Sequence, residues 1–276
     1  MNERDLFAGK ITIVTGAASG IGRAVAVRLG GFGALICAAD INERGAQETV
    51  SLVNGAGGSG YALKLDVTKS ADVRKLVNAV VRKHGRLDYM FNNAGIAIVG
   101  ESRDMTDAHW KKIIDINLMG VLAGTLAAYR IMVKQGFGHI VNTASLAGLI
   151  PVPLESSYSL TKYAVVGLST SLRGEGAGLG VKVSAICPGF VRTPIIDNYM
   201  PVGFNPADLA KIQPPKMTDA DKAARIILTG VAKNEAIILV GRDAHIAWFL
   251  YKVWPGLVEF FGRRGMDDLR KIRKTK

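Results

Sequence analysis

The 276-residue sequence has few of the residues that build metal centres or disulfide-stabilised domains. It contains only two cysteines, Cys37 and Cys187, and its four histidines are scattered along the chain without paired spacing. Metal sites need such ligands in clusters, and disulfide frameworks need several cysteines close together in the sequence. Both cysteines fall within predicted buried strands, so we expect reduced thiols in the core and no metal site.

Long apolar runs and basic stripes are also missing. Hydrophobic residues make up 49% of the chain, but no run reaches the roughly 18 uncharged apolar residues that a membrane-spanning helix needs. The first five residues mix acidic with basic side chains and form no apolar export segment. Residues 262–276 hold seven basic and two acidic residues, a surplus of +5 out of the net charge of +12, and the other basic residues are dispersed. We therefore expect a cytoplasmic protein without a nucleic-acid partner.

What the sequence does have is a regular alternation of short Val- and Ile-rich runs with longer stretches of helical periodicity. This pattern is typical of βαβ units, whose helices cover both faces of a parallel sheet. With right-handed crossovers, it predicts one α/β domain over residues 1–276, a doubly wound Rossmann-type parallel sheet of seven strands with helices on both faces. The expected strands are Ile11–Val14, Ala34–Ala39, Tyr61–Leu65, Leu87–Phe91, His139–Thr143, Lys182–Ile186 and Ala236–Val240.

A glycine-rich turn, residues 15–22, directly follows the first predicted strand and opens a helix. Gly16 permits a tight turn, Gly20 lets the backbone approach a pyrophosphate, and Gly22 allows the helix to pack closely. The spacing is GxxxGxG rather than GxGxxG, but its place between a strand and a helix predicts a dinucleotide site. The residues expected to contact this cofactor are Gly16, Ser19, Gly20, Ile21 and Gly22.

Acidic residues end the next two predicted strands. Asp40 closes the second strand, where a carboxylate accepts hydrogen bonds from ribose hydroxyls and repels a 2′-phosphate. An NADP site usually has a basic residue there or just before the second glycine, where this chain has Ser19, and Arg44 lies further along. The sequence therefore favours NAD. Asp66 and Val67 end the third strand and are placed to meet the adenine ring, although Asp66 is also placed to cap the following helix.

Tyr158 and Lys162 are four residues apart, so they lie on one face of a predicted helix. An adjacent ammonium group stabilises phenolate and lowers the pKa of a tyrosine, which would make Tyr158 a general acid/base. The same spacing also fits an ordinary pair on a helix surface. Ser145, at the end of the fifth strand, is placed to hold a substrate oxygen beside Tyr158. Asn117, on an apolar helix, fits a water relay to Lys162.

Together these segments resemble the short-chain dehydrogenase/reductase family, in its single-domain subgroup, over roughly residues 8–240. The resemblance implies hydride transfer between a nicotinamide cofactor and a carbonyl or alcohol carbon. It implies a catalytic tetrad of Asn117, Ser145, Tyr158 and Lys162, with Tyr158 and Lys162 also at the cofactor. The further cofactor contacts that it implies, after the fourth and sixth strands, are Asn93, Ala94, Gly95, Pro188, Gly189, Val191 and Thr193.

Three apolar stretches are expected to line the substrate pocket: Ile96–Val99, Leu146–Leu154 and a substrate loop at about residues 190–217. An apolar lining with few charges favours a small lipophilic substrate over a sugar or a carboxylate. We therefore expect an NAD(H)-dependent oxidoreductase that interconverts a lipophilic secondary alcohol and its ketone. The alternative is a 3-oxoacyl-thioester reductase, which usually uses NADPH. A non-catalytic scaffold would need a broken tetrad, and every member is present.

The C-terminal extension, about residues 242–276, combines aromatic and basic residues. Six of the nineteen aromatic residues lie between Trp248 and Phe261, and a basic run follows them. One interpretation is a pocket cover or a subunit contact within a homo-oligomer, either a dimer or a tetramer. The other is a peripheral anchor on an anionic membrane, since exposed aromatic and basic side chains together favour that location. We favour the first interpretation.

Overall fold

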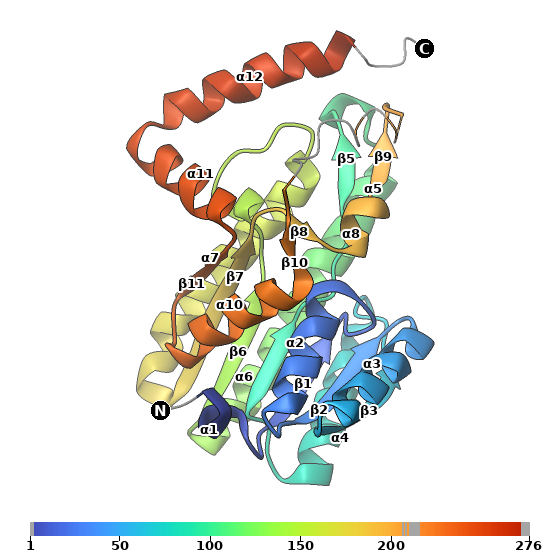
Figure 1. The fold of residues 1–276 in the computed structure, drawn as a ribbon, viewed down its shortest axis with the longest axis vertical. Coiled ribbons are helices and arrows are strands. Elements are labelled where there is room, and N and C mark those ends of the chain that lie inside the picture. Colours follow the sequence, from blue (N-terminus) through green and yellow to red (C-terminus); the bar gives the residue numbers. More distant parts are fainter. Residues whose placement is uncertain (1–2, 206, 208, 210–215, 272–276) are drawn as a thin grey trace.

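The computed structural model describes residues 3–205, 207, 209 and 216–271, and its centre is a seven-stranded sheet (Figure 1). The strand order is β11-β7-β6-β4-β1-β2-β3, and every neighbouring pair is parallel. All seven predicted strands are present, with ends within two residues of the predicted ones. They are β1 (Ile11–Thr15), β2 (Leu35–Asp40), β3 (Ser59–Lys64), β4 (Tyr89–Asn92), β6 (Gly138–Thr143), β7 (Val181–Pro188) and β11 (Ile237–Val240).

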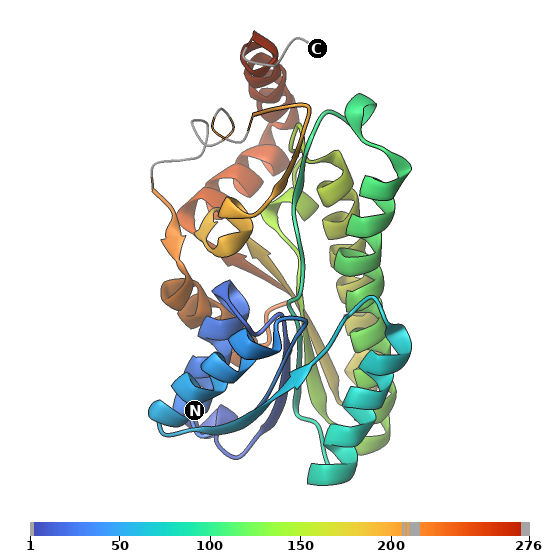
Figure 2. The same cartoon turned by 90° about the vertical axis from the view of Figure 1, so that its right-hand side faces the viewer.

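Helices cover both faces of the sheet, which confirms the doubly wound arrangement (Figure 2). One layer holds α1 (Glu3–Phe7), α2 (Gly20–Gly31), α3 (Glu43–Gly55) and α10 (Ala220–Ala232). The other holds α4 (Ser70–His84), α6 (Gly120–Gln135) and α7 (Ser156–Gly176). The winding reverses between β1 and β4, because the chain proceeds from β1 to β2 and β3 on one side and returns to β4 on the other. Ligands of such sheets bind at this reversal, beyond the carboxyl ends of the strands.

Alternation along each strand explains why the central strands are apolar throughout. In β1, Val14 packs into the layer that contains α2, while its neighbour Ile13 packs into the layer that contains α6. A strand that is covered on both faces has no polar side to present to water. Cys37 and Cys187 lie in such strands, buried and unpaired, so the predicted reduced thiols are confirmed.

A long helical run precedes β6. It consists of α5 (Asp107–Ile114), a π-helical turn (Asp115–Met119) and α6, and it is long and apolar enough to cross a membrane. In the fold, however, α6 lies against β4 and β6, with Ala128 and Met132 fully buried. The composition of this run is therefore that of a helix in the core of an α/β domain.

Short elements that the sequence pattern did not predict hold the substrate loop. Strand β5 (Ile98–Gly100) pairs with β9 (Met200–Val202), and β8 (Val191–Arg192) pairs with β10 (Thr218–Asp219). A short helix, α8 (Pro194–Asp197), lies between β8 and β9. Residues 206, 208 and 210–215 of the predicted loop fall outside the described residues. Further short helical turns lie at Ser102–Asp104, Leu146–Gly148 and Ala177–Leu179.

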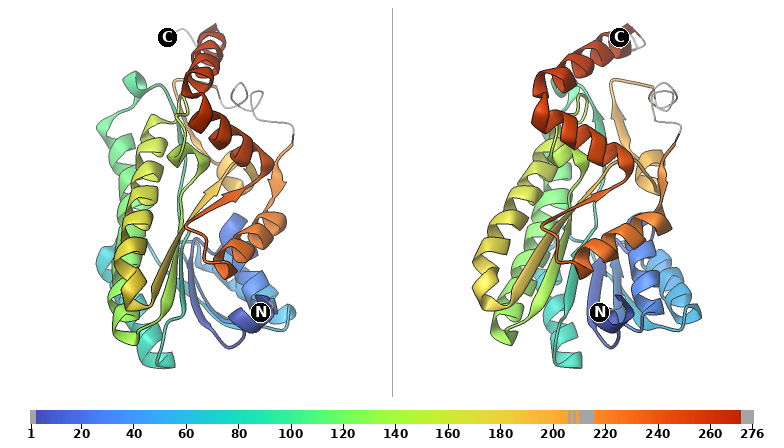
Figure 3. Two further views of the ribbon diagram at one scale, coloured as in Figure 1. Left: turned by 90° about the vertical axis from the view of Figure 1, so that its left-hand side faces the viewer. Right: turned by 60° about the vertical axis from the view of Figure 1, so that its left-hand side comes forward.

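Two helices extend the chain beyond β11 (Figure 3). Helix α11 (Arg242–Val253) packs its inner face, with Ala247, Trp248 and Tyr251, on the core cluster around Val165. Trp254 ends α11, and α12 (Pro255–Lys271) then starts in a new direction, because Pro255 cannot continue the ladder of α11. The last five residues of the predicted extension, 272–276, lie outside the described part.

Candidate active site

The glycine turn after β1 is packed so closely that side chains are excluded. Gly16 has φ +66°, and a Cβ on it would lie 2.7 Å from the Cα of Ala94. A Cβ on Gly22 would overlap the carbonyl oxygen of Gly16. The backbone at the start of α2 is thus open to a ligand, and a helix N-terminus binds anions such as a pyrophosphate. The turn therefore fits the predicted dinucleotide.

The loop after β4 is joined to this turn by hydrogen bonds. The backbone N–H groups of Asn93 and Ala94 donate to the hydroxyl of Thr15, at 3.0 and 3.3 Å. The Asn93 side chain donates to the carbonyl of Gly16 at 3.3 Å and accepts from the Thr143 hydroxyl at 3.2 Å. Three neighbouring strands, β1, β4 and β6, are therefore held together at the winding reversal. Thr15 and Thr143 were not among the predicted site residues.

The substrate loop reaches the glycine turn from the other side. A Cβ on Gly20, which has φ +54°, would lie 3.2 Å from the Cβ of Thr193. Ser19 occupies the N-cap position of α2, where it is exposed and makes no side-chain capping bond, and Ile21 packs on the core. The first turn of α2 thus lies beside Thr193. Two of the segments that were predicted to contact the cofactor, the glycine turn and the stretch that contains Thr193, therefore meet here.

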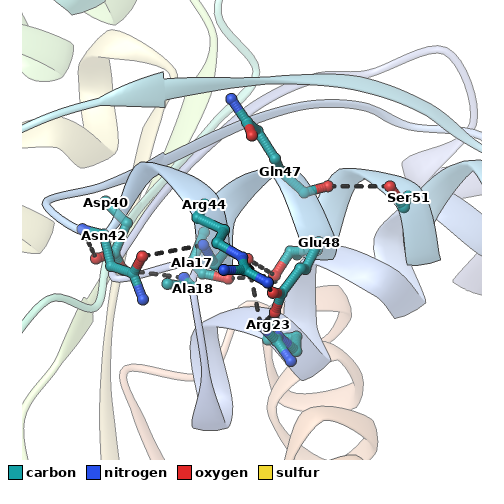
Figure 4. Close-up of polar contacts among 11 residues, drawn as sticks. Ala17, Ala18, Arg23, Asp40, Asn42, Arg44, Gln47, Glu48 and Ser51 are labelled. Carbon is teal, nitrogen blue, oxygen red and sulfur yellow. Dashed lines mark hydrogen bonds and ion pairs between the residues drawn. The ribbon is translucent and has the colours of Figure 1, made fainter.

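Asp40 is held at the carboxyl end of β2 by two backbone N–H groups (Figure 4). Ala18, in the glycine turn, donates to one carboxylate oxygen at 2.9 Å, and Asn42 donates to the other at 2.9 Å. A carboxylate oxygen accepts more than one hydrogen bond, so Asp40 remains able to accept a ribose hydroxyl. Its negative charge is fixed beside the turn.

The arginines nearest to this carboxylate are engaged by Glu48 (Figure 4). Arg44 pairs with Glu48 at 3.6 Å, one turn away on α3, and Arg23 of α2 pairs with Glu48 at 3.2 Å. Arg23 also donates to the Thr49 hydroxyl at 3.0 Å. These contacts direct both guanidinium groups to α3 and leave Asp40 as the charged group at the end of β2.

Asp66 shapes the turn that follows β3. Its carboxylate accepts the N–H of Thr68 at 3.0 Å and the Thr68 hydroxyl at 2.7 Å, and this hydroxyl bond lowers the pKa of Asp66. The N-cap residue of α4 is Lys69, so Asp66 fixes the preceding turn and does not cap the helix itself. Val67 packs closely on the start of α6, where a Cβ on Gly120 would come within 2.9 Å of it.

Asn117 is fully buried in the π-helical turn between α5 and α6. Its amide oxygen accepts the N–H of Ile96 at 2.8 Å, and its amide nitrogen donates to the carbonyl of Ile96 at 2.8 Å. The sequence suggested a water relay as the reason for a buried amide, and the structure supplies this direct pairing. Single π-helical turns occur frequently at functional sites. The amide ties the loop after β4 to the long helical run.

The other three predicted catalytic side chains come together beside Asn117. Ser145 follows β6 beside Tyr158, whose pKa its hydroxyl acts to lower, and the ammonium of Lys162 lies 5.3 Å from the centre of the Tyr158 ring. Lys162 donates to the Thr143 carbonyl at 2.8 Å. A Cβ on Gly95 would lie 3.2 Å from the Asn117 amide oxygen and 3.7 Å from the Lys162 ammonium. All four side chains are therefore grouped at the carboxyl ends of β4 and β6.

Burial dominates the protonation behaviour of this group. It raises the pKa of Tyr158, the charge of Glu155 raises it further, and only the hydrogen bond with Ser145 lowers it. Burial also lowers the pKa of Lys162 to about 8. The sequence-based expectation that Lys162 lowers the pKa of Tyr158 is wrong for this structure, because the lysine is itself desolvated and bonded to a backbone carbonyl.

Two carboxylates at the site were missed by sequence reasoning. Asp243, in the first turn of α11, accepts the N–H of Phe190 at 2.7 Å and packs against Gly189, where a Cβ would overlap it. Asp243 thereby holds the Pro188-Gly189 turn. Val191, two residues further along in β8, is buried. Glu155 precedes α7, and burial raises its pKa to about 7. Neither residue belongs to a local motif, although an acidic residue at a helix start is a weak signal.

The three stretches predicted to line the pocket do meet. Leu154, Phe204 and Leu209 form a buried cluster, with Val99 and Tyr199 packed against it. This group, together with Met266, is called the apolar cluster below. Met266 comes from α12 and was not predicted. Next to it, the Tyr158 ring packs on a second group that contains Ile98 and Met200. An apolar surface thus adjoins the tyrosine.

Comparisons with known proteins agree with this geometry. The family model for short chain dehydrogenases matches residues 10–201. Cyclohexanol dehydrogenase from an Acinetobacter strain is 32% identical over 223 residues, which cover 80% of this chain and 87% of that protein. The 3-oxoacyl-(acyl-carrier-protein) reductase FabG of Thermotoga maritima is 32% identical over 234 residues, which cover 85% of this chain and 94% of that protein.

A solved structure extends the likeness to the whole fold. The crystal structure of a short chain dehydrogenase/reductase from Burkholderia phymatum in complex with NAD has a TM-score of 0.84 and 30% sequence identity, and the match covers 93% of this chain and 96% of that one. The sheet topology, the glycine turn and the family match over most of the sequence lead to one conclusion. The chain belongs to the short-chain dehydrogenase/reductase family of oxidoreductases.

Proposed function

We propose that the protein is an NAD(H)-dependent dehydrogenase that interconverts a lipophilic secondary alcohol and its ketone. The observation that carries the proposal is the position of Tyr158, which lies beside Ser145 and Lys162 and packs its ring on the buried cluster that contains Ile98. A proton-transfer group with an apolar surface on one side suits a substrate that has one reacting oxygen and an apolar body.

In this proposal each of the four side chains of the predicted tetrad has its own role. Ser145 donates a hydrogen bond to the substrate oxygen, and Tyr158 takes the hydroxyl proton during oxidation and returns it during reduction. Lys162, with a pKa of about 8, is largely protonated at neutral pH and is held beside the Tyr158 ring by its hydrogen bond to the Thr143 carbonyl. Asn117 positions Ile96 and the loop after β4. A bound nicotinamide supplies the hydride acceptor or donor.

The cofactor preference for NAD is proposed from the charge at the end of β2. Asp40 is fixed by the N–H groups of Ala18 and Asn42, and Arg44 is paired with Glu48. A 2′-phosphate would meet a carboxylate there, while ribose hydroxyls would meet an acceptor. The proposed cofactor contacts are those of the glycine turn, Asp40, Asp66, Val67, the loop after β4, Tyr158, Lys162 and the segment from Pro188 to Thr193.

Fluorescence titration of the purified protein tests this preference. We expect NADH to bind more tightly than NADPH, and Asp40→Ala to narrow the difference by about tenfold, since one unfavourable charge contact is removed. Glu43→Ala is a matched control, because this exposed carboxylate begins α3 close by. Equal affinities of the parent protein for the two cofactors would contradict the proposal.

The substrate class is supported by the apolar surroundings of Tyr158 and by the relative that is a cyclohexanol dehydrogenase. The relative FabG supports the alternative, a 3-oxoacyl-thioester reductase. Initial rates of NAD⁺ reduction over a panel of secondary alcohols, beside rates of NADPH oxidation with a 3-oxoacyl thioester, separate the two. Faster turnover of the thioester than of every alcohol would replace the proposal with the alternative.

The outer face of α11 is proposed as a subunit contact in a homodimer or homotetramer. Its side chains at helical spacing, Ile246, Phe249, Leu250, Val253 and Trp254, are 37–68% exposed. A contiguous apolar patch of this kind marks an interaction surface. The patch lies on α11, whose residues 242–253 include two basic residues and one acidic residue, while the basic surplus of the extension lies in residues 262–276. The patch itself therefore carries little charge that would attract an anionic membrane, and it suits contact with a second copy better.

The assembly mass and vesicle binding test this contact together. We expect an oligomer in solution, and Val253→Asp should shift its mass toward the monomer because the charge would be buried at the contact. Lys252→Asp is the matched control, since that exposed side chain stacks on the ring of Trp248. Salt-sensitive sedimentation with anionic vesicles, together with an unchanged mass of the Val253 variant, would favour the membrane interpretation instead.

A further inference from the structure

One face of α12 is packed along the substrate side of the molecule. In Figure 1, α12 runs from the end of α11 toward β5 and β9. Its contacts recur every four residues: Gly262 lies against Pro153, Met266 joins the apolar cluster, and Arg270 pairs with Glu101. Residues four apart share a face of a helix. That face is therefore laid against the loop before α7, the apolar cluster and the end of β5.

The pairing of Arg270 with Glu101 is a charged contact at a buried carboxylate. Glu101 is 8% exposed, and Arg270 donates to one of its oxygens through two nitrogens, at 3.1 and 3.3 Å. Arg103 donates to the other oxygen at 2.9 Å. Burial acts to raise the pKa of Glu101, but the bonds from Arg270 and Arg103 outweigh it and hold the pKa below its usual value. Charge-assisted pairs of this kind are stronger than neutral hydrogen bonds.

On the opposite face of α12, the side chains that the structure describes have no comparable packing. Phe260 and Arg264 are exposed there, and a single residue, Trp254, joins α12 to α11. An element with few buried contacts opens locally at lower cost than the core. The packed face thus determines the position of α12, and Met266 is the side chain of this face that packs against the apolar cluster.

We propose that α12 is the specificity-determining wall of the substrate pocket, with Met266 contacting the part of the substrate remote from the reacting carbon. Leu154 and Phe204 are buried in the same cluster that Met266 packs against, so we expect the preferred substrates to be secondary alcohols with an apolar substituent of limited length. The pair of Arg270 and Glu101 holds the wall in place. The inference rests on the proposed alcohol dehydrogenase function and deepens it.

The first test measures how the substrate length preference depends on Met266. We would measure kcat/KM with NAD⁺ for 2-alkanols from 2-butanol to 2-decanol, in the parent protein, Met266→Ala and Phe260→Ala. Met266→Ala should raise the ratio of long-chain to short-chain kcat/KM by about tenfold or more, because removing part of an apolar wall changes discrimination by that order. Phe260→Ala, on the outer face of the same helix, should leave the ratio unchanged.

The outcomes separate the wall from the underlying function. If the parent oxidises none of the alcohols, the proposed function is overturned and the inference falls with it. If the parent oxidises them and Met266→Ala leaves the length ratio within twofold of the parent value, only the role of α12 is overturned. A changed length ratio together with an unchanged NADH affinity supports the role of α12 as a wall. A general loss of folding would lower the NADH affinity as well.

The second test examines the charged pair without using turnover. Hydrogen exchange of the amides in α12 should become faster in Arg270→Ala, while Arg264→Ala, a matched arginine on the outer face, should leave it unchanged. In the same Arg270 variant, we expect KM to rise more for long than for short alcohols, with kcat for the shortest alcohol preserved. Exchange in α12 that is equal in the two variants would overturn the role of the Arg270 pair.

Discussion

The cofactor half and the substrate half of the molecule are built in different ways. The cofactor half consists of β1 to β4 with their helices, and its site is fixed by backbone packing, as at Gly16 and Gly22. The substrate half is assembled from segments that are distant in the sequence, such as Val99, Leu154, Phe204 and Met266. The first half therefore tolerates little variation, while the second can change its shape through single side chains.

The two halves meet at α7, which carries Tyr158 and Lys162. Tyr158 shares a helix turn with Glu155 and follows Leu154, which has φ +66° although it is not a glycine. Such a conformation costs energy and persists only where the surrounding structure holds it. Gly100, in β5, donates its N–H to the Leu154 carbonyl at 2.8 Å, which is one of the contacts that hold it. With this conformation, one short segment places Leu154 in the apolar cluster and leads directly into the helix that holds Tyr158.

The sharpest way to separate chemistry from cofactor binding is Tyr158→Phe. The variant keeps the ring that packs on Ile98 but loses the hydroxyl, so kcat should fall by about 10²-fold or more while NADH still binds. Steady-state kinetics and a fluorescence titration measure the two effects. Tyr163→Phe, an exposed tyrosine on the same helix, is the control and should be neutral. Near-normal turnover in the Tyr158 variant would place proton transfer elsewhere.

Gly22→Ala should break the cofactor half selectively. The added methyl would overlap the carbonyl oxygen of Gly16, and overpacking of this kind costs about 1–3 kcal/mol. We expect lower NADH affinity and a lower free energy of unfolding in denaturant titrations. Gly167→Ala is the control: it lies in α7 with nothing within 4 Å, and should add about 0.5–1 kcal/mol of stability. Equal behaviour of the two variants would contradict the packing argument.

The same division explains how much could be predicted from the sequence. The sheet, the glycine turn and the grouping of Asn117, Ser145, Tyr158 and Lys162 follow from local motifs placed at the carboxyl ends of strands, and the structure brings these residues together. The apolar stretches of the pocket were also found, because their composition is unusual.

Contacts between distant segments could not be predicted in this way. Met266 and Arg270 lie more than a hundred residues from Leu154 and Glu101, and no periodicity relates them. The short pairings of β5 with β9 and β8 with β10 involve two or three residues each, too few to show an alternating pattern. The pKa of Tyr158 was misjudged because burial, which depends on the whole fold, outweighs the spacing to Lys162.

The smallest effect is expected at the junction of the two halves, where Glu155 precedes α7. Its pKa is about 7, so it is ionised mainly above pH 7, and its charge then raises the pKa of Tyr158. Alcohol oxidation needs the deprotonated tyrosine, so the rate increases as the pH rises toward that pKa. Glu155→Gln removes the charge and lowers the pKa of Tyr158. The rising limb of log kcat against pH should therefore move to lower pH.

The pH window distinguishes this charge effect from a change in structure. Below about pH 6, Glu155 is mostly protonated in the parent, so the variant and the parent should have similar rates there, and the difference should grow as the carboxylate ionises. Glu175→Gln, an exposed glutamate near the other end of α7, should leave the profile unchanged. A limb that stays in place or moves to higher pH in Glu155→Gln would show that this carboxylate does not act on Tyr158. A uniform loss of rate at every pH would indicate instead that Glu155 serves packing.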